Sequence, residues 1–254
     1  MIFCCPHCGG VFASRHGTAV CPAQHSFDRA REGYLNLLVG GRLAGSTTPG
    51  DTPESLQARR RFLHGGWYSP VADGLVAALG DTDGPVLDVG CGEGWYLTQV
   101  ASPRKNGLDI AKRAVQMASR LHPDGQFVVG SAHRLPVLEG SCAAVYSVFS
   151  PHSLDEFRRV LAPGGRWITV TPGSRHLEEM RPNKNESIRE RESRRDEPPG
   201  HADSAERITF GLTLPPDAAD DLFAMTPLQW QTAASAAPTA TVTVDVWVAQ
   251  GSKT

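Results

Sequence analysis

The chain has 254 residues, of which 40% are hydrophobic and 20% charged, and its formal net charge at pH 7 is -2. This composition supports a buried core and excludes an intrinsically disordered chain. No apolar run approaches the roughly 20 residues that span a bilayer, and the N-terminus lacks the basic start and apolar stretch of a secretory signal. We therefore expect a cytoplasmic protein with no membrane partner.

Four of the six cysteines lie within the first 21 residues. Cys5-Pro-His-Cys8 and Cys21-Pro-Ala-Gln-His25 form the pattern C-x2-C-x12-C-x3-H. In a reducing cytosol, such a cluster indicates metal ligation rather than a disulfide framework. Three thiolates and one imidazole suit tetrahedral Zn²⁺, and four protein ligands leave no open position for chemistry. The spacing therefore predicts a structural zinc module over residues 1–38.

Other assignments within this segment remain open. A redox pair is the alternative to zinc, and Cys4 is an alternative ligand to Cys5. His7 and His16 are interpreted as solvated loop residues. A group of large apolar residues after the ligands is expected to anchor the module to its neighbour: Phe27, Tyr34, Leu35, Leu37 and Leu38.

Residues 39–70 are predicted to form a linker and a basic helix. Residues 39–53 are rich in Gly, Thr and Pro, as is typical of a loop. Thr52-Pro-Glu-Ser is a helix-start signal, and the helix is expected to run to Leu63. Residues 1–70 contain seven arginines and four acidic residues, a net +3 that leaves -5 for the rest. A basic appendage suits RNA, but a solvated Arg-rich helix surface explains the charge equally well.

The remainder, residues 71–254, is predicted to be one α/β domain. A helix is expected over Ser69–Leu79, and from residue 85 short apolar strands alternate with helices, which indicates a mainly parallel sheet with helices on both faces. Strands are predicted at Val86–Val89, Asn106–Ile110, Phe127–Val129, Ala143–Phe149 and Arg166–Thr171, and helices at Trp95–Ala101, Lys112–Leu121 and Leu154–Leu161. Pro163-Gly-Gly165 is predicted to be a turn.

The C-terminal third has a different pattern. Residues 181–207 are dominated by charged and polar residues, and they are interpreted as a mobile loop or a loosely held helix. Regular structure is expected to resume at Ile208–Leu214, followed by a helix around Asp217–Met225. Alternating valines predict a half-buried strand over Thr241–Val248.

A glycine-rich segment follows the strand at Val86–Val89. It reads Asp88-Val-Gly90-Cys-Gly92-Glu93-Gly94, and glycines there allow a sharp turn and close approach of a ligand to the backbone. Asp109 ends the next strand, where a carboxylate can accept both ribose hydroxyls of a nucleoside. This arrangement resembles the class I methyltransferase fold, which binds S-adenosylmethionine. A nicotinamide enzyme, a fold without cofactor, and a helix-capping role for Asp109 are the alternatives.

The chain as a whole resembles the RlmA family of 23S rRNA guanine-N1 methyltransferases. The resemblance rests on the zinc pattern, on Phe27-Asp-Arg-Ala-Arg-Glu-Gly-Tyr-Leu-Asn-Leu-Leu38, and on the glycine loop. Further matching stretches are Pro49-Gly-Asp, Gln57-Ala-Arg-Arg-Arg-Phe-Leu63, Gly66-Trp-Tyr-Ser-Pro70, Ser131-Ala-His-Arg-Leu-Pro136, Thr171-Pro-Gly-Ser-Arg-His176 and Met225-Thr-Pro227. It implies zinc on Cys5, Cys8, Cys21 and His25, and cofactor contacts from Tyr68, Gly92, Glu93, Asp109 and His176, to which the loop pattern adds Gly90.

The resemblance also implies the reaction. It predicts methyl transfer from S-adenosylmethionine to guanine N1 in a 23S rRNA hairpin, with the zinc module and Arg59–Arg61 holding phosphates. Some members of the family in antibiotic-producing actinomycetes confer macrolide resistance in this way. Phe149 is a candidate to stack on a flipped base, with a core role as the alternative. No residue is predicted as the catalytic base.

Two other functions remain open. The first is a small-molecule methyltransferase that tailors an antibiotic, and the second is a non-catalytic zinc-ribbon protein that binds RNA. The oligomeric state is also open, with a homodimer among the options.

Overall fold

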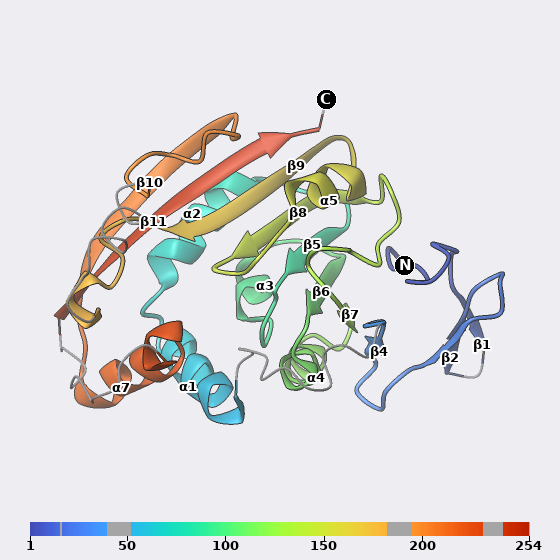
Figure 1. Cartoon of the computed structure of the whole chain (residues 1–254), viewed down its shortest axis with the longest axis horizontal. Helices are drawn as coiled ribbons and strands as arrows, with labels where there is room; N and C mark the ends of the chain where they lie inside the picture. The colour runs from blue at the N-terminus through green and yellow to red at the C-terminus, as the bar shows by residue number, and fades with distance from the viewer. Residues whose placement is uncertain (16, 40–51, 182–194, 231–240, 254) are drawn as a thin grey trace. The chain divides into compact units, whose positions relative to one another are not determined.

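The computed structural model describes residues 1–15, 17–39, 52–181, 195–230 and 241–253 (Figure 1). The chain divides into two units. The first comprises Met1–Gly50, Leu79–Ile168 and Ser252–Thr254, and the second comprises Asp51–Ala78 and Thr169–Gly251. Most of the expected linker (40–51) and part of the polar stretch (182–194) lie outside the described residues, as does His16.

The first unit is built on a parallel sheet. Its central strands are short and apolar, and all four residues of β5 are buried, as expected for strands covered on both faces. β8 pairs with β5, β5 with β6, and β6 with β7, all in parallel. The predicted mainly parallel sheet is confirmed. The bounds are β5 Val86–Val89, β6 Lys105–Asp109, β7 Gln126–Val129, β8 Cys142–Val148 and β9 Leu161–Pro172, which lies beside β8.

Three helices belong to this unit: α3 Trp95–Gln99, α4 Lys112–Leu121 and α5 Leu154–Val160. α4 buries Ala114, Val115, Ala118 and Ser119, which recur at helical spacing, and it packs against β6 and β7. α5 begins after Ser153, whose hydroxyl accepts a hydrogen bond from Glu156 N at 3.4 Å. These helices agree with the predicted ones to within two residues at each end.

The N-terminal segment is joined to this sheet on two sides. A small antiparallel sheet consists of β1 Ala13–Arg15, β2 Thr18–Val20 and β3 Ser26–Asp28. Before it, Cys4 N donates to Pro136 O at 2.9 Å, and Leu138 N to Ile2 O at 2.9 Å. After it, β4 Leu35–Asn36 pairs in parallel with β7. Tyr34, Leu35 and Leu37 are buried, which confirms three of the five predicted anchors.

The second unit contains α1 Pro53–His64, α2 Ser69–Leu79 (whose last residue belongs to the first unit), η2 Glu178–Met180, α7 Pro216–Ala224 and η3 Pro227–Trp230. Its strands are β10 Ser204–Thr213 and β11 Thr241–Ser252, which pair in antiparallel fashion, and the end of β9 lies beside β11. The predicted start of α1 is confirmed, because Thr52 Oγ1 accepts from Ser55 N at 3.1 Å. The four predicted valines of β11 are all buried.

Three strand boundaries differ from the prediction by more than two residues. The expected turn at 163–165 lies inside β9, where Gly164 N donates to Lys253 O and Lys253 N to Gly165 O, although Gly164 keeps a positive φ of 74°. β10 starts at Ser204, because Glu206 and Arg207 pair with β11 despite their charge. β11 itself continues to Ser252. In each case, pairing with a distant strand overrides the local composition.

None of the helices in the described ranges combines the length and apolarity that crossing a membrane requires.

Candidate functional site

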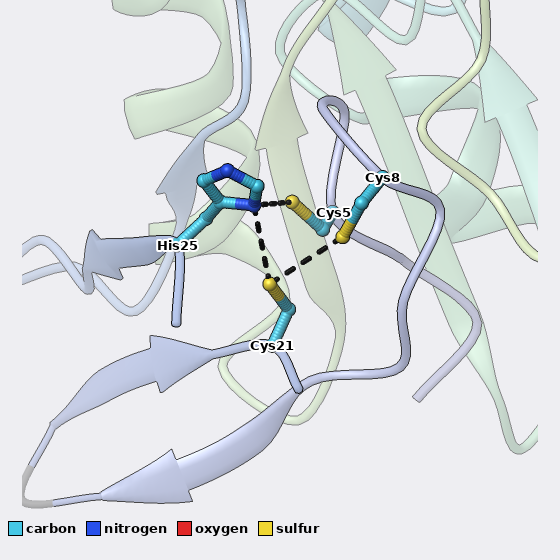
Figure 2. A group of neighbouring side chains, drawn as sticks. All are labelled: Cys5, Cys8, Cys21 and His25. Atoms are coloured by element: carbon cyan, nitrogen blue, oxygen red, sulfur yellow. Dashed lines mark hydrogen bonds between the residues drawn. The ribbon is translucent and has the colours of Figure 1, made fainter. Parts of the chain in front are cut away.

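The predicted zinc ligands converge on one point (Figure 2). The ligand atoms of Cys5, Cys8, Cys21 and His25 all lie within 4.8 Å of one another. Cys8 Sγ is 3.5 Å from Cys21 Sγ, and His25 Nδ1 is 3.5 Å from Cys5 Sγ and 3.4 Å from Cys21 Sγ. With Zn–S bonds of about 2.3 Å, a tetrahedral site has S–S edges of about 3.8 Å. The donor set therefore fits one zinc ion.

Two turns bring these ligands together. In the first, Gly9 N donates to Cys5 O at 2.8 Å and Cys5 N donates to Gly10 O at 2.9 Å. In the second, Cys21 follows β2 and His25 precedes β3, and Cys21 N donates to His25 O at 3.0 Å. Because β2 and β3 are antiparallel neighbours, their connecting turn places both ligands at one end of the small sheet.

One thiol of this cluster, that of Cys21, has a lowered pKa, whereas the pKa of Cys8 is raised. Burial opposes ionisation of Cys21, but hydrogen bonds from Cys8 and from the main chain and side chain of His25 lower its pKa to about 7. Thiolate is the form that binds zinc. The structure also separates Cys4 from Cys5. Cys4 is buried outside the cluster, and burial raises its pKa. His7 is exposed, as expected, although its ring centroid lies 4.9 Å from that of His25.

The glycine loop leaves β5 at its carboxyl end. Gly90, Gly92 and Gly94 have φ values of 79°, 54° and 86°, which L side chains rarely adopt. A Cβ added to Gly90 would lie 1.9 Å from Ser150 Oγ, so both conformation and space require glycine there. Gly90 N and Cys91 N both donate to Leu108 O, at 2.8 and 3.0 Å. The backbone of the loop is thereby held against the end of β6.

Asp109 meets this loop as predicted. Because β5 and β6 are parallel neighbours, their carboxyl ends lie side by side. Asp109 Oδ2 accepts from Gly92 N at 2.9 Å, and Oδ1 accepts from Ala111 N at 2.8 Å, just before α4. The second contact reaches Ala111, the N-cap residue of α4, so it ties the carboxylate to the start of that helix. A carboxylate offers about four lone-pair sites in all, so it can accept several hydrogen bonds at once. The arrangement fits an adenosyl cofactor.

Two further acids are buried around the loop. Asp88 is 1% exposed and Glu93 is 3% exposed. Burial raises the pKa of Asp88 well above its ordinary value and the charge of Asp109 adds to the rise, although the Tyr146 hydroxyl opposes it. Asp88 therefore resists ionisation more than an exposed aspartate does. Glu93 lies in the loop itself, between two glycines with positive φ.

Tyr68 and His176, which only the family resemblance suggested, belong to the second unit. Tyr68 is buried, with ring centroids 5.0 Å from Phe62 and 6.3 Å from His176. His176 Nδ1 accepts from Asp245 N at 3.3 Å. Burial lowers the pKa of His176 to about 4, and the nearby Arg181 acts in the same direction. No local spacing links residues 68 and 176, so sequence patterns alone could not have paired them.

Phe149 follows β8 and is exposed, with 37% of its surface accessible. This excludes the core role considered as the alternative. Its φ of 53° is uncommon for a bulky residue, and such strain is frequent at functional sites. The next residue, Ser150, is the one in contact with Gly90. Residue 149 therefore follows the carboxyl end of β8 and directly precedes the residue that packs against the glycine loop.

The expected arginine cluster on α1 is partly engaged within the protein. Arg61 donates to both oxygens of Asp221 on α7, and Arg59 Nη2 lies 3.5 Å from Met225 O. Arg60 is exposed. Two of the three predicted phosphate ligands thus connect α1 to the segment around α7.

Two family models match the chain. Residues 86–165 match the model described as "Methyltransferase domain", and residues 3–39 match the one described as "RlmA, N-terminal". The first match covers the sheet from β5 to β9, with the glycine loop and Asp109, and the second covers the zinc-ligand cluster. Fold and loop together define an S-adenosylmethionine-dependent methyltransferase with an N-terminal zinc ribbon.

Two relatives indicate the family of methyltransferases to which this chain belongs. The 23S rRNA (guanine(748)-N(1))-methyltransferase of Streptomyces fradiae is 32% identical over 89% of this chain and 85% of that protein. A protein of Micromonospora griseorubida, provisionally named a 23S rRNA (guanine-N(1)-)-methyltransferase, is 38% identical over 69% of this chain and 67% of its own length. The chain belongs to this family of 23S rRNA (guanine-N1)-methyltransferases. A solved geranyl diphosphate C-methyltransferase of Streptomyces coelicolor A3(2) aligns with a TM-score of only 0.45, at 14% identity over 73% of this chain and 77% of that one.

Proposed function

We propose that this protein methylates N1 of one guanine in a hairpin of 23S rRNA, with S-adenosylmethionine as the methyl donor. The observation that carries the proposal is the similarity to the Streptomyces fradiae enzyme, which extends over both the zinc ribbon and the methyltransferase domain. A small-molecule methyltransferase has no evident need for the first of these parts. The three-part organisation expected from the sequence, 1–38, 39–70 and 71–254, belongs to the same proposal.

The cofactor contacts are assigned to Gly90, Gly92, Glu93 and Asp109. Their support is the bare backbone of the loop and the Asp109 carboxylate bonded to Gly92 N. Tyr68 and His176 are proposed as further contacts on the strength of the family resemblance. When bound, the cofactor supplies an electrophilic methyl group on a sulfonium. The task of these residues is to hold and orient it, since alignment supplies much of the rate in such a transfer.

The zinc ion is proposed to be structural. Cys5, Cys8, Cys21 and His25 would fill all four positions of a tetrahedron, which leaves none for a substrate or water. The ion would stabilise turns that contain few apolar residues of their own. The ribbon would thereby offer a folded surface to RNA. Exposed Arg60, on α1 of the second unit, is a separate candidate phosphate contact.

The target base is proposed to stack on Phe149. Enzymes that modify a base take it out of its stack and hold it against aromatic side chains. Phe149 is exposed at the same sheet edge as the glycine loop, which is where ligands bind in open α/β sheets. Strand β8 ends in Ser147-Val-Phe-Ser-Pro151 rather than in the Asn/Asp-Pro-Pro-aromatic motif that grips an exocyclic amine. This difference favours a ring nitrogen as the acceptor.

The direct test is methylation of an unmodified 23S transcript with labelled S-adenosylmethionine, followed by mapping of reverse-transcription stops. We expect one stop at a hairpin guanine, because a methyl group on N1 blocks Watson–Crick pairing. Label found only in small molecules would contradict the RNA substrate. Expression in a macrolide-sensitive host would then measure whether the modification confers resistance, the physiological role proposed here.

Asp109→Ala tests the cofactor site. We expect the affinity for S-adenosylhomocysteine to fall about 100-fold, because two charge-assisted hydrogen bonds to the ribose are lost. Calorimetry measures the affinity, and circular dichroism checks that the variant folds. Asp109→Asn is the matched control, since it retains shape and one acceptor oxygen and should lose less. Unchanged affinity in Asp109→Ala would refute the assignment.

Phe149→Ala tests the base contact. We expect methylation of the transcript to fall by about 10- to 100-fold, since stacking of one base on an aromatic ring contributes about 1–3 kcal/mol. Binding of S-adenosylhomocysteine should not change. Phe149→Tyr keeps the ring and should retain most activity. Equal rates for the alanine and tyrosine variants would exclude stacking.

A further inference from the structure

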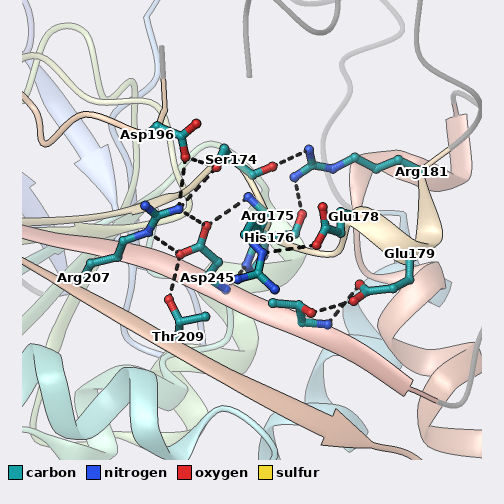
Figure 3. A network of polar contacts seen from close by, with 11 residues as sticks. Ser174, Arg175, His176, Glu178, Glu179, Arg181, Asp196, Arg207, Thr209 and Asp245 are labelled. Atoms are coloured by element: carbon teal, nitrogen blue, oxygen red, sulfur yellow. Dashed lines mark hydrogen bonds and ion pairs between the residues drawn. The ribbon is translucent and has the colours of Figure 1, made fainter. Parts of the chain in front are cut away.

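A buried carboxylate lies in the second unit, at a position that the family resemblance does not name. Asp245 is on β11, in a strand otherwise dominated by valine, and it is 0% exposed (Figure 3). An ionised group removed from water is costly unless it is paired and hydrogen-bonded. Such a residue in a valine strand therefore requires a structural explanation.

Its partners come from the neighbouring strand. Arg207 binds both carboxylate oxygens, with Nε 2.7 Å from Oδ1 and Nη2 2.8 Å from Oδ2, and Thr209 Oγ1 donates to Oδ1 at 3.0 Å. Thr209 is directly opposite Asp245 in the β10–β11 register, and Arg207 is two residues away on the same face. The Arg207 guanidinium also lies 5.4 Å from the centroid of the Trp247 ring.

These contacts keep Asp245 charged. Burial opposes ionisation, but Arg207, the Arg175 N–H and the Thr209 hydroxyl together lower the pKa of Asp245 to about 2. The carboxylate is therefore negatively charged at neutral pH. Such an acceptor can hold backbone N–H groups strongly.

The backbone that it holds is the segment between β9 and η2. Arg175 N donates to Asp245 Oδ2 at 2.9 Å, and Gly173 N donates to Asp245 O at 2.8 Å. A Cβ on Gly173 would lie 2.4 Å from Asp245 Oδ2, so the backbone there approaches the carboxylate as closely as only glycine permits. Arg207 Nη2 also donates to Ser174 Oγ at 3.2 Å. The charged pair thus binds Ser174 and Arg175, and the main-chain carbonyl of Asp245 binds Gly173.

His176 is the next residue, and the same strand determines its tautomer. Asp245 N donates to His176 Nδ1, so Nδ1 carries no proton and Nε2 carries it. The ring is next to that of Tyr68, at 6.3 Å between centroids. The orientation of His176 therefore follows from the position of residues 173–175 and from the backbone of Asp245.

We propose that Asp245, with Arg207, is a positioning residue for the cofactor-binding histidine: it holds residues 173–175 so that His176 lies beside Tyr68 as the Nε2–H tautomer. Asp245 itself does not contact the cofactor. The inference rests on the proposed function, in which His176 binds S-adenosylmethionine. It adds Arg207 and Asp245 to the residues that support cofactor binding, and both lie far from the glycine loop in the sequence.

The test uses Asp245→Asn in the full chain, because asparagine preserves the shape and removes the charge. We expect the affinity for S-adenosylhomocysteine, measured by calorimetry, to fall about tenfold, the value of one charge-assisted hydrogen bond. Asp221→Asn is the matched control, because it breaks the Arg61 ion pair of the same unit without touching residues 173–176. It should leave the affinity unchanged.

A double-mutant cycle separates positioning from a general loss of stability. If Asp245 acts through His176, Asp245→Asn should reduce affinity little further in a His176→Gln background. The ¹⁵N chemical shifts of the His176 ring should show one tautomer in the wild type and a mixture in Asp245→Asn. Additive losses, or an unaltered tautomer, would overturn the proposal.

Failure of the proposed function and failure of this inference give different results. If wild-type protein fails to bind S-adenosylhomocysteine, the proposed function fails and this inference fails with it. If the wild type binds and Asp245→Asn binds equally well, only the inference fails. Should Asp245→Asn not fold, Thr209→Val removes a single hydrogen bond to the same carboxylate and should show a smaller loss in the same cycle.

Discussion

The zinc-ligand cluster lies in the first unit and the Asp245 network in the second, and the two are assembled in different ways. The cluster takes its four ligands from residues 5–25, and both ligand pairs sit in short turns. The network joins residues 173–176, 207, 209 and 245 across three segments. The first can be recognised from spacing, whereas the second exists only through the register of two strands.

The difference shows where local chemistry suffices. Two ligands that must reach one ion from a single turn can stand only a few residues apart, so the spacing itself records the site. A carboxylate that bonds across a sheet can lie at any separation along the chain, because the register supplies the proximity. Asp245 therefore carries no signal in the sequence beyond an acid in a valine strand.

The largest expected effect concerns the zinc-ligand cluster, whose ligands are close together in the sequence. Replacing Cys5 and Cys8 together with serine should abolish zinc binding, by more than about 100-fold in affinity, because even outer-shell partners of a metal are worth 10- to 100-fold. Residues 1–38 should lose protection from hydrogen exchange. Elemental analysis measures zinc, expected at one ion per chain in the wild type. Cys4→Ser, adjacent but outside the cluster, should keep the metal.

A smaller effect tests the network as a source of stability. Arg207→Met should lower the free energy of unfolding by about 3–5 kcal/mol, because it leaves the buried charge of Asp245 without its partner. Arg61→Met removes the exposed partner of Asp221 and should cost about 0–1 kcal/mol. Urea denaturation of both variants provides the comparison. Similar losses in the two would mean that burial of Asp245 adds nothing.

The smallest effect is a pH dependence. The pKa of His176 is lowered to about 4 from an ordinary value near 6.5, chiefly by burial. The unfolded chain therefore binds the extra proton first, so this stabilising contribution is complete above about pH 6.5 and is lost as the pH falls toward 4. We expect a change of about 1–2 kcal/mol over that window, since the ring is not fully removed from water.

His176→Gln should abolish the part of the pH dependence of stability that this histidine causes. Thermal melts from pH 4 to 7 measure that dependence. A wild-type curve parallel to that of the variant would contradict the assigned burial of this histidine.

The cofactor loop is less predictable from the sequence than the zinc-ligand cluster and more predictable than the Asp245 network. Its glycines and Asp109 were recognisable from the sequence because a parallel sheet places the ends of neighbouring strands together, whatever else the fold contains. The contact between Gly90 and Ser150 was not recognisable, since it depends on how the segment after β8 turns back. The exposed, strained conformation of Phe149 was likewise undetermined, and the sequence left its core and surface roles equally open.

Strand boundaries show the same division. Periodicity placed β5 and the helices of the first unit, because apolar residues at a fixed spacing have few alternatives. It misplaced the start of β10, where Glu206 and Arg207 are too polar to predict a strand. In the structure Glu206 pairs with Val248 and Arg207 with Trp247. It also placed a turn at Gly164, where hydrogen bonds to Lys253 continue the strand.

The sequence by itself determined that a Cys/His metal-binding pattern lies within the first 25 residues, and it determined the parallel sheet and the glycine loop with its acid. Each of these follows from bonds or spacings within one or two neighbouring elements. Only the tertiary structure decided how the zinc ribbon joins the sheet through β4, which thiol is left out, and which residues surround His176. Those arrangements depend on contacts between segments more than 30 residues apart, and no local pattern of residues encodes the register that creates them.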